Sequence, residues 1–406
     1  MSLSSKTNQN SKEVSYSVSF LIVAIVISFG IITQVVFGNL HLEKLIFPRN
    51  IVVLFLIISL IIIGNWKFRG SSIVSWLSST KAAISSIVGF TVVTLIMGLL
   101  TQGTSTNTFI SKLGLNTIAS SWIYAFSLLL LLFSLGFATI KRLYPLKKSN
   151  FWFILNHLGL WVTIVAANFG SIDQTHLRIS VSTAKYANIA FGEKGEMNIL
   201  PFSLKQKEFS LETYNPRITI MDSTTTMISV KSGKNTLEAK SNNSIILKNW
   251  NIKVLQYLPS AELTGTKIVA FDSIGTAPAA YVSARNVQTN KQLTGWLSCG
   301  GNLITKMYLS LDSEHMLVML PPADKEYKVL LYINNGKHTF SKQISINNPY
   351  TYLGWQMYIV DFNRDKAKWS DSTIIELVND PWQPVVYMGL FMMIVGSLFV
   401  FWRGKK

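Results

Sequence analysis

The stretch "NHLGLWVTIVAANFG", residues 156–170, decides how this chain is organised. It belongs to an apolar run, 152–170, which is long enough for a helix to cross a bilayer. A polar side chain inside such a span is costly and is usually retained for function. His157 therefore raises two linked questions, namely where the membrane lies along the chain and what an imidazole does inside it.

Apolar runs of similar length flank one large segment of mixed composition. The whole chain has 49% hydrophobic and 14% charged residues, with a mean hydropathy of +0.33, which is typical of a membrane protein. The pattern predicts six spans, at 18–38, 49–64, 82–100, 120–140, 152–170 and about 383–402. We therefore expect an N-terminal membrane bundle (1–170), an exported domain (171–381) and a final span with its tail (382–406).

The net charge of +17 is concentrated beside the predicted spans. Residues 171–381 carry a net charge of +4, and the remainder carries +13. This distribution argues against nucleic acid as a partner and indicates a membrane topology. One alternating set of flanking segments holds 12 Lys and Arg residues, whereas the opposite short loops hold three. The positive-inside rule then predicts a multi-pass protein of the bacterial inner membrane with both termini cytoplasmic and the large domain periplasmic.

Residues 171–381 show the alternation of antiparallel β-strands. The clearest predicted hairpin is 327–346, where two alternating arms flank Asn334-Asn335-Gly336. Further strands are predicted in 226–240 with a turn at 232–235, in 244–258, and in 354–362 paired with 372–378. Where the chain leaves this domain for the final span, Asp380 is placed to cap the last helix and Pro381 to lie in its first turn. We predict a mostly antiparallel sandwich or barrel-like domain.

The sequence contains no recognisable catalytic constellation. No two of its five histidines are three or four residues apart, as a local metal pair on a helix requires. No HExxH, GxSxG or glycine-rich phosphate loop is present. The only cysteine, Cys299, excludes a disulfide within the chain and any CxxC or CxxCH motif, and we interpret it as a small half-buried residue. Whether the fold assembles an enzyme stays open.

His157 has two interpretations when the residues are considered alone. It lies about five residues inside its predicted helix, and Trp161 follows at i+4 on the same face. It could be a neutral histidine that hydrogen-bonds a neighbouring helix. It could also be a ligand or a proton relay, since a neutral imidazole is a good axial ligand for haem iron. The other histidines considered, His41, His176 and His338, are predicted to be solvated surface residues.

Four stretches carry a resemblance to a known family. They are "FILNHLGLWVTIVAANFGSID" (153–173), "LPFSLKQKEFSLETY" (200–214), "ISINNPYTYLGWQMYIVDF" (344–362) and "VNDPWQPVVYMGLFMMIVG" (378–396). In order and spacing they resemble the ResB/CcsB family of System II cytochrome c biogenesis proteins, in a Bacteroidetes-like form. The resemblance covers roughly residues 150–402. Many members have three spans before the exported domain, whereas five are predicted here.

The resemblance implies a function in haem delivery. Family members act with a CcsA-type membrane protein as a cytochrome c haem lyase, which takes haem from the cytoplasmic side and attaches it outside to apocytochrome c. His157 matches the membrane histidine regarded as an axial ligand of the transported haem b, and Trp161 is the candidate for its pocket. The tryptophan-rich WWD segment belongs to the partner and is absent here. The competing interpretation is a scaffold or accessory subunit of another envelope complex, anchored among membrane lipids and without haem.

Overall fold

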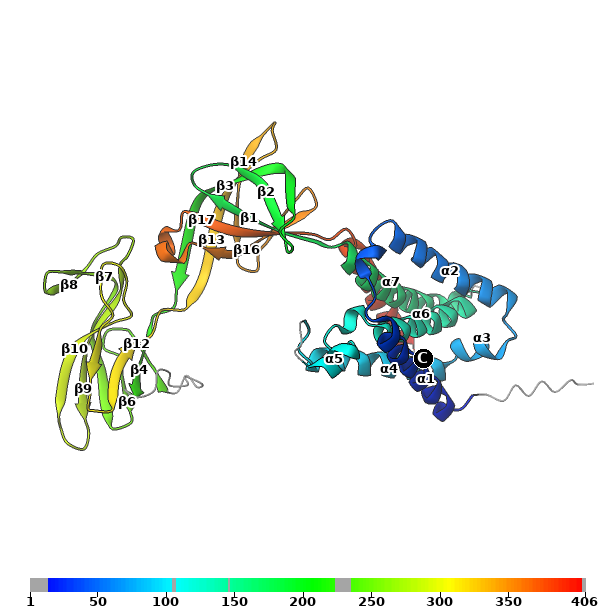
Figure 1. Ribbon diagram of the computed structural model, residues 1–406, viewed down its shortest axis with the longest axis horizontal. Helices are drawn as coiled ribbons and strands as arrows, with labels where there is room; N and C mark the ends of the chain where they lie inside the picture. The colour runs from blue at the N-terminus through cyan, green and yellow to red at the C-terminus, as the bar shows by residue number, and fades with distance from the viewer. Residues whose placement is uncertain (1–13, 104–106, 145–146, 223–234, 404–406) are drawn as a thin grey trace, which may run out of the picture. The chain divides into compact units, whose positions relative to one another are not determined.

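The computed structural model describes residues 14–103, 107–144, 147–222 and 235–403. The chain divides into two compact units, which Figure 1 shows in one view. One is helical and combines Met1–Gln174 with Asp380–Lys406. The other is built of β-strands and comprises Thr175–Asn379.

Six helices in the described part of the chain are long and apolar enough to span a membrane. They are α1 (Tyr16–Phe37), α2 (Arg49–Lys67), α4 (Thr80–Leu99), α6 (Trp122–Leu143), α7 (Phe151–Asp173) and α8 (Gln383–Arg403). Short helices lie between them: η1 (Leu42–Leu45), α3 (Ser72–Leu77), α5 (Thr108–Lys112), η2 (Ile118–Ser120) and η3 (Lys148–Asn150). Each long helix falls on one of the predicted apolar runs, so the predicted set of span-length helices is confirmed.

Serine side chains fix where several of these helices begin. The side chains of Ser15, Ser71, Ser79 and Ser121 accept hydrogen bonds from the first-turn N–H groups of α1, α3, α4 and α6, respectively. Helix α6 lies at the centre of the unit, where Leu132 is fully buried. It packs with Ile57 of α2 and Val165 of α7 in one hydrophobic cluster.

The β unit contains an eight-stranded antiparallel sheet in the order β14-β13-β3-β2-β1-β17-β16-β15. Its strands are β1 (Thr175–Ser182), β2 (Ala187–Gly192), β3 (Met197–Thr213), β13 (Asp324–Asn334), β14 (Thr339–Ser345), β15 (Tyr350–Tyr352), β16 (Trp355–Phe362) and β17 (Ser372–Asn379). The sheet curls around one core, so that Phe340 of β14 contacts Tyr352 of β15 with ring centroids 5.3 Å apart.

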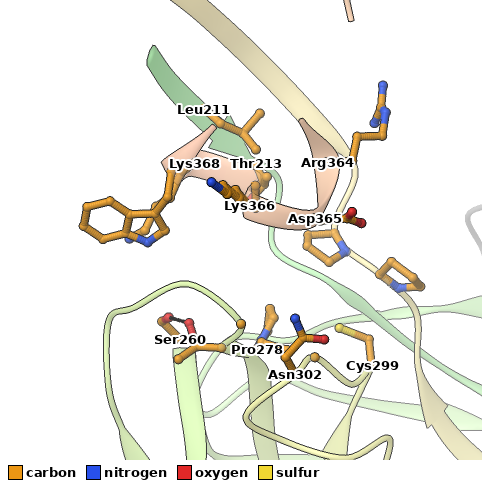
Figure 2. A pocket seen from close by; sticks show the side chains of 18 of the residues that line it. Leu211, Thr213, Ser260, Pro278, Cys299, Asn302, Arg364, Asp365, Lys366 and Lys368 are labelled. Atoms are coloured by element: carbon orange, nitrogen blue, oxygen red, sulfur yellow. Dashed lines mark hydrogen bonds between the residues drawn. The ribbon is translucent and has the colours of Figure 1, made fainter. Parts of the chain in front are cut away.

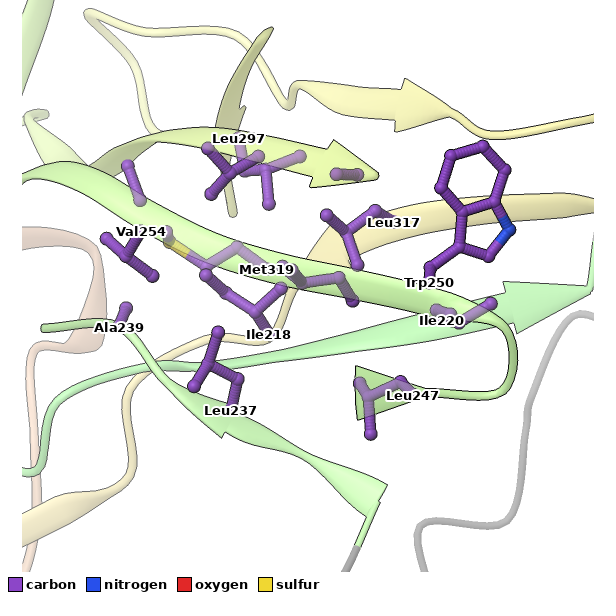
Figure 3. Close-up of a cluster of buried hydrophobic side chains, with 14 of the residues drawn as sticks. Ile218, Ile220, Leu237, Ala239, Leu247, Trp250, Val254, Leu297, Leu317 and Met319 are labelled. Atoms are coloured by element: carbon purple, nitrogen blue, oxygen red, sulfur yellow. The ribbon is translucent and has the colours of Figure 1, made fainter. Parts of the chain in front are cut away.

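Two smaller antiparallel sheets complete the β unit. Their orders are β10-β9-β7-β6, with β8 on β7, and β11-β12-β4-β5. The strands are β4 (Arg217–Asp222), β5 (Leu237–Glu238), β6 (Ser244–Leu247), β7 (Trp250–Thr264), β8 (Lys267–Ala270), β9 (Ala277–Asn286), β10 (Gln292–Ser298), β11 (Tyr308–Ser310) and β12 (His315–Met319). Side chains of both sheets, including Ile218, Val254 and Leu317, form a shared core (Figure 3). The predicted large antiparallel domain is therefore confirmed.

Several local predictions can be compared with this fold. The hairpin predicted in 327–346 is β13–β14, and the pair predicted in 354–378 is β16–β17. The loop between the latter strands contains a 3-10 helix, η5 (Arg364–Trp369), that was not predicted. The turn predicted at 232–235 falls mostly outside the described residues. The Asp380 carboxylate accepts hydrogen bonds from the N–H groups of Trp382 and Gln383, each at 3.0 Å, which confirms the cap.

Candidate functional site on helix α7

One face of α7 is closely packed against α8. A Cβ added at Gly159 would lie 2.5 Å from the backbone nitrogen of Met393, and one added at Gly396 would lie 2.5 Å from that of Asn156. The Asn156 amide donates hydrogen bonds to the Met393 carbonyl at 3.0 Å and to the Ser397 hydroxyl at 2.5 Å. Small residues at helix crossings allow such close approach, and polar groups then link the backbones. The Asn156 amide is therefore engaged in hydrogen bonds with α8.

Phe153, His157 and Trp161 follow one another at intervals of four residues on α7. The His157 ring is half-buried and stacks on Phe153, with ring centroids 3.6 Å apart and 26° between the planes. Its Nδ1 lies 3.0 Å from the Phe153 carbonyl oxygen. A carbonyl oxygen only accepts, so we assign the proton of the neutral imidazole to Nδ1. Nε2 then keeps a lone pair, as in a histidine that binds a metal.

Arg142 brings a positive charge to the same aromatic ring. Its guanidinium carbon lies 3.6 Å from the Phe153 ring centroid, which is a cation–π contact between α6 and α7. The two helix ends are also joined by the Asn150 amide, which donates to the Arg142 carbonyl at 3.3 Å. In the sequence, Arg142 is distinguished only as one of the basic residues beside the predicted spans. The sequence shows that Phe153 precedes His157 by four residues. It does not show that Phe153 contacts Arg142, because that contact depends on how α6 packs against α7.

Trp161 connects the middle of α7 to α6. Its indole N–H donates to the Leu132 carbonyl at 3.1 Å, and its ring packs against the central hydrophobic cluster. This gives Trp161 a packing role one turn beyond His157. Its participation in a haem pocket stays a prediction.

The far end of α7 is fixed by a carboxylate. Asp173 accepts hydrogen bonds from the Phe47 N–H at 2.8 Å, the Asn50 amide at 2.6 Å and the Trp382 indole N–H at 2.7 Å. These donors come from three segments of the helical unit. The Asp173 carboxylate therefore joins these segments to the end of α7, and we assign it a structural role.

The remaining histidines lie outside α7. His41 and His338 are exposed, as predicted. His176 is half-buried, with Nδ1 3.7 Å from a Glu376 carboxylate oxygen. His315, on which the sequence offered no signal, has its Nδ1 2.9 Å from an Asp312 carboxylate oxygen.

The surroundings of His315 do not constitute a metal site. Its Nε2 lies 2.6 Å from Lys248 Nζ and 3.2 Å from an Asp222 carboxylate oxygen. A hydrogen bond from the backbone N–H of Glu314, together with His315, holds the pKa of the Asp312 carboxyl below its usual range. Throughout the described ranges, no group of three or more His, Cys, Asp or Glu side chains could hold a metal ion.

The β unit contains an open cavity of about 810 Å³ (Figure 2). Its cationic side chains are already paired within the chain: Arg364 with Asp324, Lys366 with Asp371 and Lys368 with Asp272.

Cys299 lies in the wall of this cavity, is half-buried and is unpaired, as predicted. Burial raises the pKa of its thiol, which lowers its reactivity. We assign no chemistry to this cavity.

Comparison with known proteins adds no identification: no protein-family model matches the chain, and no curated protein is significantly similar to it. The candidate site is therefore defined by its own residues, on α7 and α6. It consists of His157, whose Nδ1 is bonded to the Phe153 carbonyl and whose Nε2 keeps its lone pair, stacked on Phe153, with Arg142 against the same ring.

Proposed function

We propose that the chain is a multi-pass subunit of a System II cytochrome c haem lyase in the bacterial inner membrane. In this proposal it carries haem b to the outer side and presents it to apocytochrome c, together with a CcsA-type membrane protein. The observation that carries the proposal is the hydrogen bond from His157 Nδ1 to the Phe153 carbonyl, because it leaves Nε2 available as a neutral ligand on a helix of membrane-spanning length.

The charges beside the helices support the direction of transport. Four basic residues, Lys141, Arg142, Lys147 and Lys148, precede α7. The positive-inside rule assigns that end, and with it His157, to the cytoplasmic leaflet. Haem made in the cytoplasm would meet His157 before it reaches the outer side. The tail charges used in the same argument, Lys6, Lys12, Lys405 and Lys406, lie outside the described residues.

The donor set on α7 fits a haem as cargo. A porphyrin is a flat apolar ring with two carboxylates, and its iron accepts axial imidazole ligands. His157 supplies the imidazole, Phe153 positions that imidazole by stacking on it, and Arg142, which lies against the same ring, supplies a cation for a carboxylate. The step that bonds haem to the apocytochrome is assigned to the complex, because this chain has no CxxC pair and no catalytic motif.

A gene deletion tests the proposed function. We expect deletion to abolish covalently attached haem in c-type cytochromes, measured by haem staining after denaturing electrophoresis. Expression of the His157→Ala variant should fail to restore the stain, whereas His41→Ala, which changes an exposed histidine, should restore it. Normal holocytochrome c in the deletion strain would contradict the proposal and leave the scaffold interpretation in its place.

A further inference from the structure

The outward face of the β2–β3 hairpin is apolar. Ile189, Phe191, Met197 and Ile199 are 43%, 51%, 64% and 76% exposed, respectively. The register pairs Ile189 with Ile199 and Phe191 with Met197, so the four side chains form one continuous patch. We call it the hairpin patch. The outward face of an antiparallel sheet is normally polar, and a continuous apolar patch marks an interaction surface.

The hairpin patch is separate from the core of the domain. The alternate residues Ala190, Leu200 and Phe202 point inward and are buried. On the neighbouring strand β1, the outward positions are the exposed Arg178 and Ser180. The apolar character is therefore a property of both faces of this hairpin and does not continue onto β1.

The hairpin turn lies at the end of the domain where the chain enters from α7. Only Gln174 separates the last residue of α7, Asp173, from β1. Strand β2 runs back toward that end, and the register places Phe191 opposite Arg178. At about 3.3 Å per residue, the chain from Asp173 to Arg178 spans at most about 17 Å. Covalent connection alone therefore limits the separation between Arg178, which pairs with Phe191, and the last residue of a helix long enough to span a membrane.

The charges at the hairpin turn favour no particular lipid charge. The turn between β2 and β3 carries Glu193, Lys194 and Glu196, and the Glu196 carboxylate accepts a hydrogen bond from the Lys194 N–H at 3.0 Å. These three residues sum to a net charge of −1, which gives no attraction to an anionic lipid surface, so burial of apolar side chains is the available driving force.

We propose that the hairpin patch inserts into the interfacial region of the outer leaflet, with a neutral lipid surface as its partner. Phe, Ile and Met side chains are suited to this boundary. The contact would give the exported domain a further attachment to the membrane besides its two chain connections. This inference rests on the membrane insertion included in the proposed function.

Depth-dependent fluorescence quenching tests the inference on the full chain. The only cysteine is removed by Cys299→Ser, and single sites are created by Phe191→Cys or Met197→Cys in the hairpin patch. Each is labelled with an NBD fluorophore and reconstituted in phosphatidylcholine vesicles that carry nitroxides on the headgroup or on the acyl chain. Ile246→Cys on β6, 61% exposed, is the matched control in the β unit, and Phe391→Cys on α8, 69% exposed, reports membrane insertion.

We expect headgroup nitroxides to quench the labels at positions 191 and 197 at least twice as strongly as the label at 246. Acyl-chain nitroxides should quench the label at 391. Equal weak quenching at 191, 197 and 246, with strong quenching at 391, would overturn the inference and assign the hairpin patch to a protein partner. An unquenched label at 391 would instead overturn membrane insertion, and the proposed function with it.

Discussion

His157 and Asn156 are neighbours in the sequence, but their side chains form different kinds of hydrogen bond. The Asn156 amide is used to join α7 to α8, whereas the His157 Nδ1 is satisfied within its own helix. An imidazole whose first nitrogen is bound by a backbone carbonyl has a defined tautomer and presents the second nitrogen. This distinction favours ligation over a purely structural role for His157, and it cannot be obtained from residue spacing.

At the residue scale, Arg142→Gln should weaken haem binding without changing the iron ligand. The lost attraction to a haem carboxylate at an exposed site is worth up to about 1 kcal/mol, or about fivefold in affinity. Haem titration of the purified protein monitors both the affinity and the position of the Soret band.

The matched control for Arg142 is Lys141→Gln. The Lys141 ammonium donates to the Ser78 hydroxyl at 3.1 Å, so this variant removes the same charge from the same turn of α6. It should keep the parent affinity. An equal loss of affinity in both variants would show that only net charge matters.

Tyr257 provides a pH-dependent test in the β unit. Burial raises the pKa of Tyr257 to about 12. A raised folded-state pKa contributes stability that is complete below the unfolded pKa, near 10, and is lost as the pH rises through 12. Tyr257→Phe should therefore reduce the loss of stability between pH 10 and 12, measured by urea unfolding of the full chain. Tyr308→Phe, at a tyrosine that is 59% exposed, is the control for removal of a phenol hydroxyl.

At the scale of the element, the glycines of α7 and α8 determine how closely these helices pack. Gly159→Leu would place side-chain atoms against the Met393 backbone, which cannot move without displacing α8. Overpacking of this kind costs about 1–3 kcal/mol. We expect a lower midpoint of thermal unfolding in detergent.

Gly98→Ala on α4 is the corresponding control, because an added Cβ there meets no atom within 4 Å. Alanine is also the better helix former, so this variant should keep or raise the midpoint. A Gly159→Leu variant as stable as Gly98→Ala would contradict the described packing.

The sequence predicted the elements that depend on local patterns. Apolar runs located the six long helices, and Asn-Gly located the β13–β14 turn, because length and turn chemistry are encoded within a few residues. The placement of β3 between β2 and β13 depends on contacts far apart in sequence and was not predicted. For the same reason His157 and Trp161 were identified as candidates, whereas Arg142 was missed as a neighbour of Phe153.

At the scale of the whole molecule, the β unit is inserted between α7 and α8. The connections are the single residue Gln174 and the short segment 380–382. Residues Thr175 and Asn379, at the base of the β unit, are directly paired in the β1–β17 ladder. The first and last residues of the β unit therefore lie side by side. This arrangement is suited to a domain that presents a surface on one side of a membrane.

The proposed topology predicts which residues react from outside the cell. In the Cys299→Ser background, Lys194→Cys in the β2–β3 turn should react with a membrane-impermeant maleimide in spheroplasts. Arg69→Cys, in the exposed loop after α2, should react only after the membrane is opened. The reverse pattern would contradict the assigned orientation.

The central claim is that His157 Nε2 binds the iron of transported haem. The most direct measurement is the absorption spectrum of the full chain purified with the proposed CcsA-type partner, for the parent, His41→Ala and His157→Gly proteins. We predict that His157→Gly alone loses or shifts the Soret band, and that added imidazole, which fits the vacated space, restores it. A His157→Gly protein with the parent Soret band and haem content in the absence of imidazole would contradict the account.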